Sequence, residues 1–219
     1  MDDATLQRDR ERLRIAHADL VHHLEDLTAT PAADPSVPTT LPGWSRGHLL
    51  THISGNARSF LRQLAGAERG EPAERYPGGK DARNREIEEG ALRTWAAVVD
   101  DVRESSQQLD VALAAHTRWD VPGIDHDGKE LPTTEVPFRR WRETLVHHAD
   151  LGDPGFTPDD WPIEYVREEL RLLTMRWNAR RPMGATQLPQ QALRAPEITR
   201  LLWLMGRADV DGLAPAGIF

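Results

Sequence analysis

The chain has 219 residues, a formal net charge of −8 and no cysteine. This length suits one large domain or one domain with a small appendage, and the lack of cysteine excludes disulfides, thiolate metal ligands and a cysteine nucleophile. The acidic balance argues against broad nucleic-acid binding, because nucleic acids are bound by basic surfaces. No run of about 18 apolar residues occurs and the first residues are charged, so we expect a cytoplasmic protein without membrane spans.

Helical spacing of apolar residues predicts helices over residues 4–28, 45–67, 81–116 and 134–151. We expect Ser45 to cap the second helix, Asp81 the third, and Thr133 or Thr134 the fourth, whose first turn tolerates a proline. Gly90 is a candidate break or bend in the third helix. Turn signals between the third and fourth helices predict a short hairpin.

Four helices with long connections are typical of a four-helix bundle. Two further helices are expected at residues 160–180 and 196–207, and one strand could form between Met183 and Leu193. We therefore predict a mainly α protein, with a four-helix bundle over residues 1–152. Residues 153–219 would form a short, mostly helical C-terminal extension or, alternatively, a reduced α+β domain.

One pair of side chains in the fourth predicted helix has the spacing of metal ligands. Glu143 and His147 are four residues apart, so they lie on one helical face and can converge on one ion. His52 lies midway along the second predicted helix, beside its apolar face, and can point into the bundle. Two imidazoles and one carboxylate leave a fourth zinc position open, as catalytic sites do. Spacing alone also fits a solvent-exposed ion pair, so it is weak evidence by itself.

Three blocks of the sequence form a recognisable pattern. The first is LPGWSRGHLLTHISGNA at residues 41–57, the second is WRETLVHHADLG at residues 141–152, and DARNREI lies between them at residues 81–87. Together these blocks resemble the mycothiol-dependent maleylpyruvate isomerase family, in which an Ala-Arg-Asn segment also lies between the other two. The blocks occur in the family's order with similar separations. Near the C-terminus, LMGR at residues 204–207 resembles the family's Gly-Arg pair.

The resemblance implies a DinB-like helical bundle in which His52, Glu143 and His147 bind zinc or another divalent metal. It also implies mycothiol as a cofactor, whose thiol a bound zinc ion would deprotonate. Arg207 and Arg83 are then the candidate catalytic residues, because the resemblance covers both and guanidinium groups bind carboxylates in a bidentate manner.

Asn84, Arg139 and Arg142 are candidates for binding the cofactor, and Arg140 belongs to the same arginine cluster. The alternative for the three clustered arginines is a solvent-exposed position, since arginines are mostly exposed. Asn84 could instead make local backbone hydrogen bonds at a helix start. Asp150 either orients a ligand histidine or merely precedes the end of its helix.

The reaction that the resemblance implies is the cis–trans isomerisation of maleylpyruvate to fumarylpyruvate. A thiolate adds to the double bond, the new single bond rotates, and the thiol leaves. A mycothiol S-transferase, which keeps the adduct, is the alternative enzyme, because residues 181–196 are short for the family's mixed sheet. A non-catalytic metal-binding stress or regulatory module is a further alternative, as is a structural bundle without metal. We expect a small thiol and a small anionic or electrophilic substrate as partners, and a monomer or homodimer.

Overall fold

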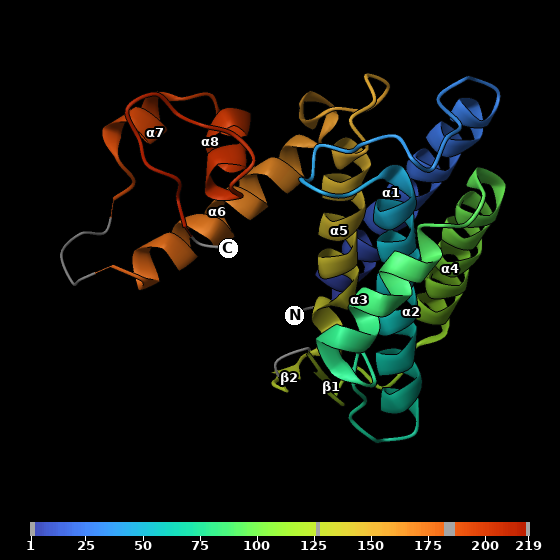
Figure 1. Ribbon diagram of the computed structural model, residues 1–219. Coiled ribbons are helices and arrows are strands. Elements are labelled where there is room, and N and C mark those ends of the chain that lie inside the picture. The colour runs from blue at the N-terminus through green and yellow to red at the C-terminus, as the bar shows by residue number, and fades with distance from the viewer. Residues whose placement is uncertain (1–2, 126–127, 182–186, 218–219) are drawn as a thin grey trace. The chain divides into compact units, whose positions relative to one another are not determined.

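The computed structural model describes residues 3–125, 128–181 and 187–217, and the chain divides into two compact units, Met1–Gly155 and Phe156–Phe219 (Figure 1). The first unit holds the long helices α1 (Asp3–Thr28), α2 (Arg46–Glu68), α4 (Trp95–Ala115) and α5 (Val136–Asp150). In this bundle α1 packs against α4 and α5, and α2 packs against the same two helices. The shorter α3 (Gly79–Gly90) lies against α2. The predicted mainly α fold is confirmed.

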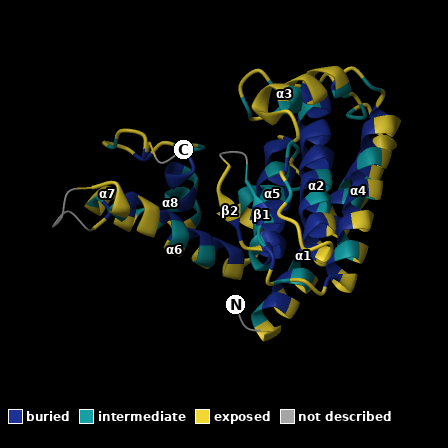
Figure 2. Ribbon diagram, turned by 90° about the horizontal axis from the view of Figure 1, so that it is seen from below, coloured by how far each residue is buried: buried dark blue, intermediate teal, exposed yellow. Residues whose placement is uncertain are grey.

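The bundle helices form because their apolar residues recur at helical spacing and meet in a common core. On α1 the buried leucines include Leu6, Leu13, Leu20 and Leu24, while most charged residues of the helix are exposed. Figure 2 shows buried and exposed residues alternating along the bundle helices. Each buried leucine contributes about 2 kcal/mol through removal of apolar surface from water. Among the described residues, no helix combines the length and hydropathy needed to cross a membrane.

The predicted hairpin is confirmed, because β1 (Gly123–Ile124) pairs antiparallel with β2 (Glu130–Leu131). A short 3-10 helix, η1 (Thr133–Glu135), follows and leads directly into α5. The prediction that Thr133 or Thr134 caps the fourth helix is therefore wrong, and Glu135 occupies the N-cap of α5. The hydroxyl of Thr133 instead donates to the carbonyl of Val121 at 3.0 Å.

The predicted N-cap residue is correct for α2 and wrong for α3. Ser45 is the N-cap of α2, as predicted, and its backbone N–H donates to Nδ1 of His48 at 3.2 Å. The prediction of an Asp81 cap is wrong, because α3 begins at Gly79 and Asp81 lies in its first turn. Gly78 is the N-cap there and has a φ of 84°, a conformation that glycine adopts without strain.

The single helix predicted over residues 81–116 is interrupted after Gly90, at the candidate break. Thr94 caps the start of α4, and its hydroxyl accepts from the N–H of Ala97 at 3.3 Å. A Cβ at Gly90 would lie 2.4 Å from Cγ2 of Thr51 on α2. The Thr51 hydroxyl donates to the carbonyl of Gly47 at 2.8 Å, so this side chain is not free to turn away. The glycine therefore permits close packing of α3 on α2.

We expect Gly90→Ala to lower the free energy of unfolding by about 1–3 kcal/mol, because overpacking against Thr51 outweighs the better helix propensity of alanine. Urea denaturation measures this change. Gly55→Ala on α2 is the matched control, since a Cβ there would meet its nearest neighbour at an ordinary 3.6 Å. The control should be neutral or gain up to about 1 kcal/mol. Equal effects of the two substitutions would contradict the packing argument.

The second unit contains η2 (Pro158–Asp160), α6 (Ile163–Ala179), α7 (Gln190–Arg194) and α8 (Glu197–Leu204). Helices α6 and α8 pack together, and the ring centroids of Trp177 and Trp203 lie 5.1 Å apart. In the described residues 156–181 and 187–217 no strand forms, and α7 occupies part of the segment where one was allowed for. Residues 183–186 of that segment lie outside the described residues.

Candidate metal site

Three predicted metal ligands meet inside the first unit, one from α2 and two from α5. Nε2 of His52 lies 3.2 Å from Oε2 of Glu143, and Nε2 of His147 lies 3.5 Å from the same oxygen. One ligand atom from each residue falls within 4.8 Å of the other two. The imidazole rings of the two histidines are nearly perpendicular, with centroids 4.8 Å apart. The structure therefore brings all three residues together, as the sequence predicts.

Burial and mutual contact perturb the three groups in different directions. Burial lowers the pKa of His52 to about 4, although its hydrogen bond with Glu143 opposes this effect. Burial would raise the pKa of Glu143, but hydrogen bonds with His147 and His52 outweigh it and hold the pKa well below its ordinary value. Burial would lower the pKa of His147, but Asp150 and Glu143 outweigh it and raise the pKa. The site thus favours an ionised carboxylate beside a neutral His52.

Asp150 contacts His147, one of the two candidate ligand histidines, as the first of its two interpretations predicts. Nδ1 of His147 lies 2.9 Å from Oδ2 of Asp150, which is 4% exposed. When His147 is neutral, this contact keeps its proton on Nδ1, and Nε2 then has the lone pair that a metal ion requires. This carboxylate–histidine pairing is the usual support of metal-binding histidines, and two nitrogens with one oxygen form a suitable donor set for zinc. The residues present fit a divalent metal.

Arg83 contacts the opposite side of the other ligand histidine. Its Nη2 donates to Nδ1 of His52 at 3.0 Å, and its Nη1 donates to Oδ1 of Asn84 at 3.1 Å. Because Nδ1 accepts this hydrogen bond, a neutral His52 carries its proton on Nε2, which faces Glu143. Both Arg83 and Asn84 lie on α3, so the position of this helix on α2 decides what surrounds His52.

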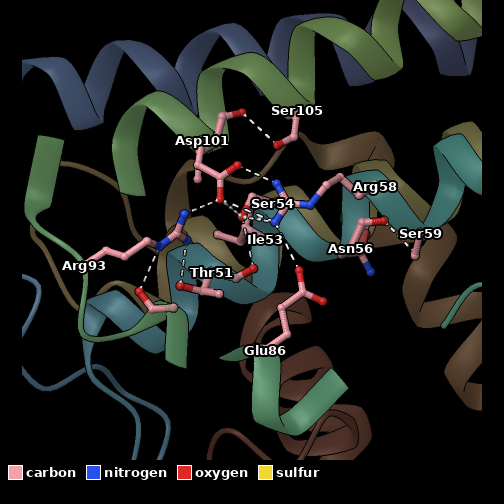
Figure 3. A network of polar contacts seen from close by, with 12 residues as sticks. Thr51, Ile53, Ser54, Asn56, Arg58, Ser59, Glu86, Arg93, Asp101 and Ser105 are labelled. Atoms are coloured by element: carbon pink, nitrogen blue, oxygen red, sulfur yellow. Dashed lines mark hydrogen bonds and ion pairs between the residues drawn. The ribbon is translucent and has the colours of Figure 1, made fainter. Parts of the chain in front are cut away.

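An ion-pair network centred on Asp101 of α4 holds α3 and the following turn against α2 (Figure 3). Asp101 accepts from Ser54 at 2.9 Å and from Arg93 at 2.8 Å, and it also pairs with Arg58. Arg58 in turn donates to Glu86 of α3 at 3.3 Å. Burial would raise the pKa of Asp101, but the Arg58 and Arg93 hydrogen bonds outweigh it and lower the pKa. The network therefore fixes α3 through charged groups from α2 and α4.

A cavity of about 410 Å³ opens beside the candidate metal ligands. Its lining combines the predicted residues His52, Glu143, Arg83 and Asn84 with side chains that sequence analysis did not assign: Asn56, Arg75, Tyr76 and Lys80. A volume of this size accommodates a small organic molecule.

The predicted cofactor-binding arginines on α5 do not line this cavity. Arg139 pairs with Glu135 one turn earlier at 2.8 Å, and the guanidinium of Arg142 lies 5.4 Å from the ring centroid of Phe138. Arg207 belongs to the second unit, where it follows α8 and lines a small cavity of about 210 Å³ with Trp203 and neighbouring residues. The predicted roles of these three arginines stay predictions.

The alternative of a solvent-exposed position is wrong for Arg140, because its side chain is fully buried. Its Nη1 donates to the carbonyl of Ile53 at 2.8 Å and to Oδ1 of Asn56 at 3.1 Å. Its Nε donates to Nε2 of His17 at 3.1 Å, and Nδ1 of His17 lies 2.9 Å from Asp110. Burial lowers the pKa of Arg140 to about 10. Arg140 is thus a core residue that connects α5 to α2 and α1.

Comparison with known proteins supports the resemblance. The family model of the mycothiol maleylpyruvate isomerase N-terminal domain matches residues 13–152. Two solved structures share the fold: the mycothiol-dependent maleylpyruvate isomerase, with a TM-score of 0.76, and a mutant of that enzyme in which alanine replaces one histidine, with a TM-score of 0.78. Each is 22% identical, and the match covers 93% of this chain and 90% of the other. In a sequence search, no curated protein matches. Since the family model covers more than half of the chain, this protein belongs to the family of the mycothiol maleylpyruvate isomerase N-terminal domain.

Proposed function

We propose that this chain is a mycothiol-dependent enzyme that isomerises maleylpyruvate to fumarylpyruvate at a metal held by His52, Glu143 and His147. The observation that carries the proposal is the convergence of these three ligand atoms beside a cavity of about 410 Å³. Membership of the family supports the activity, and so does the name of the enzyme that shares the fold. Zinc is the preferred metal, because its catalytic sites use three protein ligands and leave one position open.

A zinc ion bound here would supply the positive charge that keeps a thiol deprotonated at neutral pH. The chain itself contributes the ligands, their orientation and an enclosed space. Asp150 fixes the ring of His147 through Nδ1, and Trp44 contacts the ring of His52 edge-on, with centroids 5.5 Å apart. These contacts hold both imidazoles in place before any ligand arrives, which reduces the reorganisation that binding requires.

Arg83 would be free for another contact if Nε2 of His52 held a metal. A neutral imidazole that binds through Nε2 carries its proton on Nδ1, so that nitrogen would donate and no longer accept. The hydrogen bond from Arg83 to Nδ1, present at 3.0 Å in this structure, would then be lost. Because Arg83 also lines the cavity, we assign the released guanidinium to binding an anionic group of the substrate.

Turnover at low thiol concentration tests the proposal. Zinc-loaded protein is incubated with maleylpyruvate and a small, substoichiometric amount of mycothiol, and both product and free thiol are followed by chromatography. We expect fumarylpyruvate to form with many turnovers per thiol. Loss of one thiol for each substrate consumed, with accumulation of an adduct, would instead identify an S-transferase. No change in substrate or thiol would leave a non-catalytic metal-binding module.

His52→Ala provides the matched inactive variant for this assay. The substitution removes one of the three metal-ligand groups, and circular dichroism verifies that the variant remains folded. We expect it to lose mycothiol-dependent turnover while retaining its helical content. A folded His52→Ala protein with wild-type turnover would contradict the assignment of this site.

A further inference from the structure

Arg75 is a buried arginine in the connection between α2 and α3, and its side chain lines the same cavity as His52 and Glu143. Only 9% of the residue is exposed. Its guanidinium carbon lies 4.0 Å from the ring centroid of Phe60 and 5.5 Å from that of Tyr76. Contacts of this kind between a cation and aromatic faces are favourable and hold the guanidinium plane in place.

Hydrogen bonds fix both the backbone and the side chain of Arg75. Its N–H donates to the carbonyl of Ile124 in the hairpin at 3.2 Å, and its own carbonyl accepts from Nε of Arg62 at 2.9 Å. In the side chain, Nε and Nη2 donate to the hydroxyl of Ser59 at 3.2 Å and 3.1 Å. One edge of the guanidinium is therefore held by α2, which leaves the end formed by Nη1 and Nη2 for another acceptor.

The charge of Arg75 lacks a directly paired carboxylate within the part of the chain that the structure describes. Its described side-chain hydrogen bonds go to the neutral hydroxyl of Ser59. Among the described residues that line the cavity, Arg75 and Arg83 contribute guanidinium groups and Glu143 contributes a carboxylate. The Arg75 guanidinium is poorly solvated because the residue is buried, and this burial lowers its pKa although the charges of Tyr76 and Glu143 oppose the effect. A poorly solvated cation in a cationic cavity favours an incoming anion, because buried charges are costly unless paired.

We propose that Arg75 anchors a carboxylate-binding subsite in this cavity, with Arg83 as a second cationic contact. The subsite would take one carboxylate of a small organic dianion and thereby place its carbon skeleton beside the metal ligands. A guanidinium end with two N–H donors matches the two oxygens of a carboxylate. This inference rests on the proposed function, since it assigns the substrate class and a positioning residue to that same site.

Binding of maleate to the metal-free, full-length protein tests the subsite without any contribution from metal coordination. Calorimetry at low ionic strength compares the wild type with Arg75→Gln and Arg75→Lys. We expect Arg75→Gln to weaken maleate binding about tenfold or more, and Arg75→Lys to weaken it less, because charge is retained without the planar fork. The matched control is Arg69→Gln at the end of α2, whose side chain is 61% exposed and which does not line the cavity. An unchanged maleate affinity in Arg75→Gln would overturn the proposal.

A comparison of ligands on the wild type keeps the test decisive if Arg75→Gln does not fold. Maleate should bind, whereas maleamide, its neutral diamide, should bind at least about tenfold more weakly. Inorganic phosphate should also bind more weakly than maleate, because it lacks the carbon skeleton and the second carboxylate of the organic dianion that the cavity would hold. Equal binding of maleate and maleamide would exclude an anion subsite, and tighter binding of phosphate would overturn the carboxylate assignment.

Zinc content and steady-state kinetics separate failure of this subsite from failure of the proposed function. Zinc-loaded Arg75→Gln should retain wild-type metal content and show a raised KM for maleylpyruvate with a smaller change in kcat. Maleate binding through Arg75 without isomerase turnover in the wild type would overturn the proposed function alone. Isomerase turnover with an unchanged KM and maleate affinity in Arg75→Gln would overturn the subsite alone.

Discussion

Glu143→Gln is expected to reduce mycothiol-dependent turnover about a thousandfold or more and to weaken zinc binding strongly. The carboxylate is the negative ligand of the three, and its Oε2 lies within 3.5 Å of Nε2 of both histidines. An amide has the same shape but no charge, so it binds a divalent cation poorly. Metal ions contribute several kcal/mol to catalysis, and each 1.36 kcal/mol corresponds to about tenfold in rate.

Initial rates with maleylpyruvate and competition with a chromophoric chelator measure the two effects of Glu143→Gln. Glu104→Gln is the matched control, because it makes the same chemical change at an exposed position on α4. The control should keep wild-type turnover and zinc affinity. A folded Glu143→Gln protein that binds zinc as tightly as the wild type would show that the carboxylate is not a ligand.

Arg140→Ala is expected to produce the largest loss of stability, about 3–5 kcal/mol in the free energy of unfolding. The substitution leaves a void in the core and strands the groups that Arg140 serves, which are the carbonyl of Ile53, Oδ1 of Asn56 and Nε2 of His17. Buried polar atoms without partners are costly, and the truncated side chain also loses packing contacts. Urea denaturation followed by circular dichroism measures the change.

Arg142→Ala is the matched control for this prediction, because it lies two residues further along α5 with a partly exposed side chain. Surface substitutions usually change stability by less than about 0.5 kcal/mol, so the control should remain close to the wild type. Similar losses in the two variants would mean that the burial of Arg140 does not decide its contribution.

The bundle was predictable from the sequence because it depends on local spacing, and spacing together with the family blocks predicted that the three candidate metal ligands would converge. Glu143 and His147 share a face of α5 through their four-residue separation, and the apolar period of α2 carries His52 toward the same interior. The family blocks then joined the two helices into one site, which spacing alone could not do. That α5 lies beside α2 is a tertiary fact, established by packing between segments far apart in the chain.

The positions of Arg75 and Arg140 in the fold could not be predicted from the sequence. Arg140 belongs to a cluster of arginines whose composition is typical of a charged surface. Its side chain is buried because its position on α5 faces the core of the bundle. Arg75 lies in a connection whose sequence indicates only a break between helices. Its position in the cavity depends on contacts with Ser59, Phe60 and the hairpin, which the sequence does not show. An arginine next to an aromatic residue in that connection was the signal available, and it is a weak one.

The break after Gly90 depended on a similar combination of local and distant groups. The glycine alone indicated a bend, but the end of α3 and the restart of α4 depend on Thr94 as a cap and on Thr51 from another helix. Asp101, which ties these segments together, carries no local sequence signal for that role. Helix existence was thus predictable, whereas the interruption that positions Arg83 over His52 required tertiary contacts.

Metal analysis of protein purified without an affinity tag tests the central claim most directly. Elemental mass spectrometry of the wild type should find about one equivalent of a divalent metal per chain, predominantly zinc, as a single three-ligand site requires. The same measurement on His52→Ala should find little metal. If the wild type holds little metal, it is incubated with zinc, the excess is removed and the measurement is repeated. A content below about a tenth of an equivalent of any divalent metal would then contradict the account.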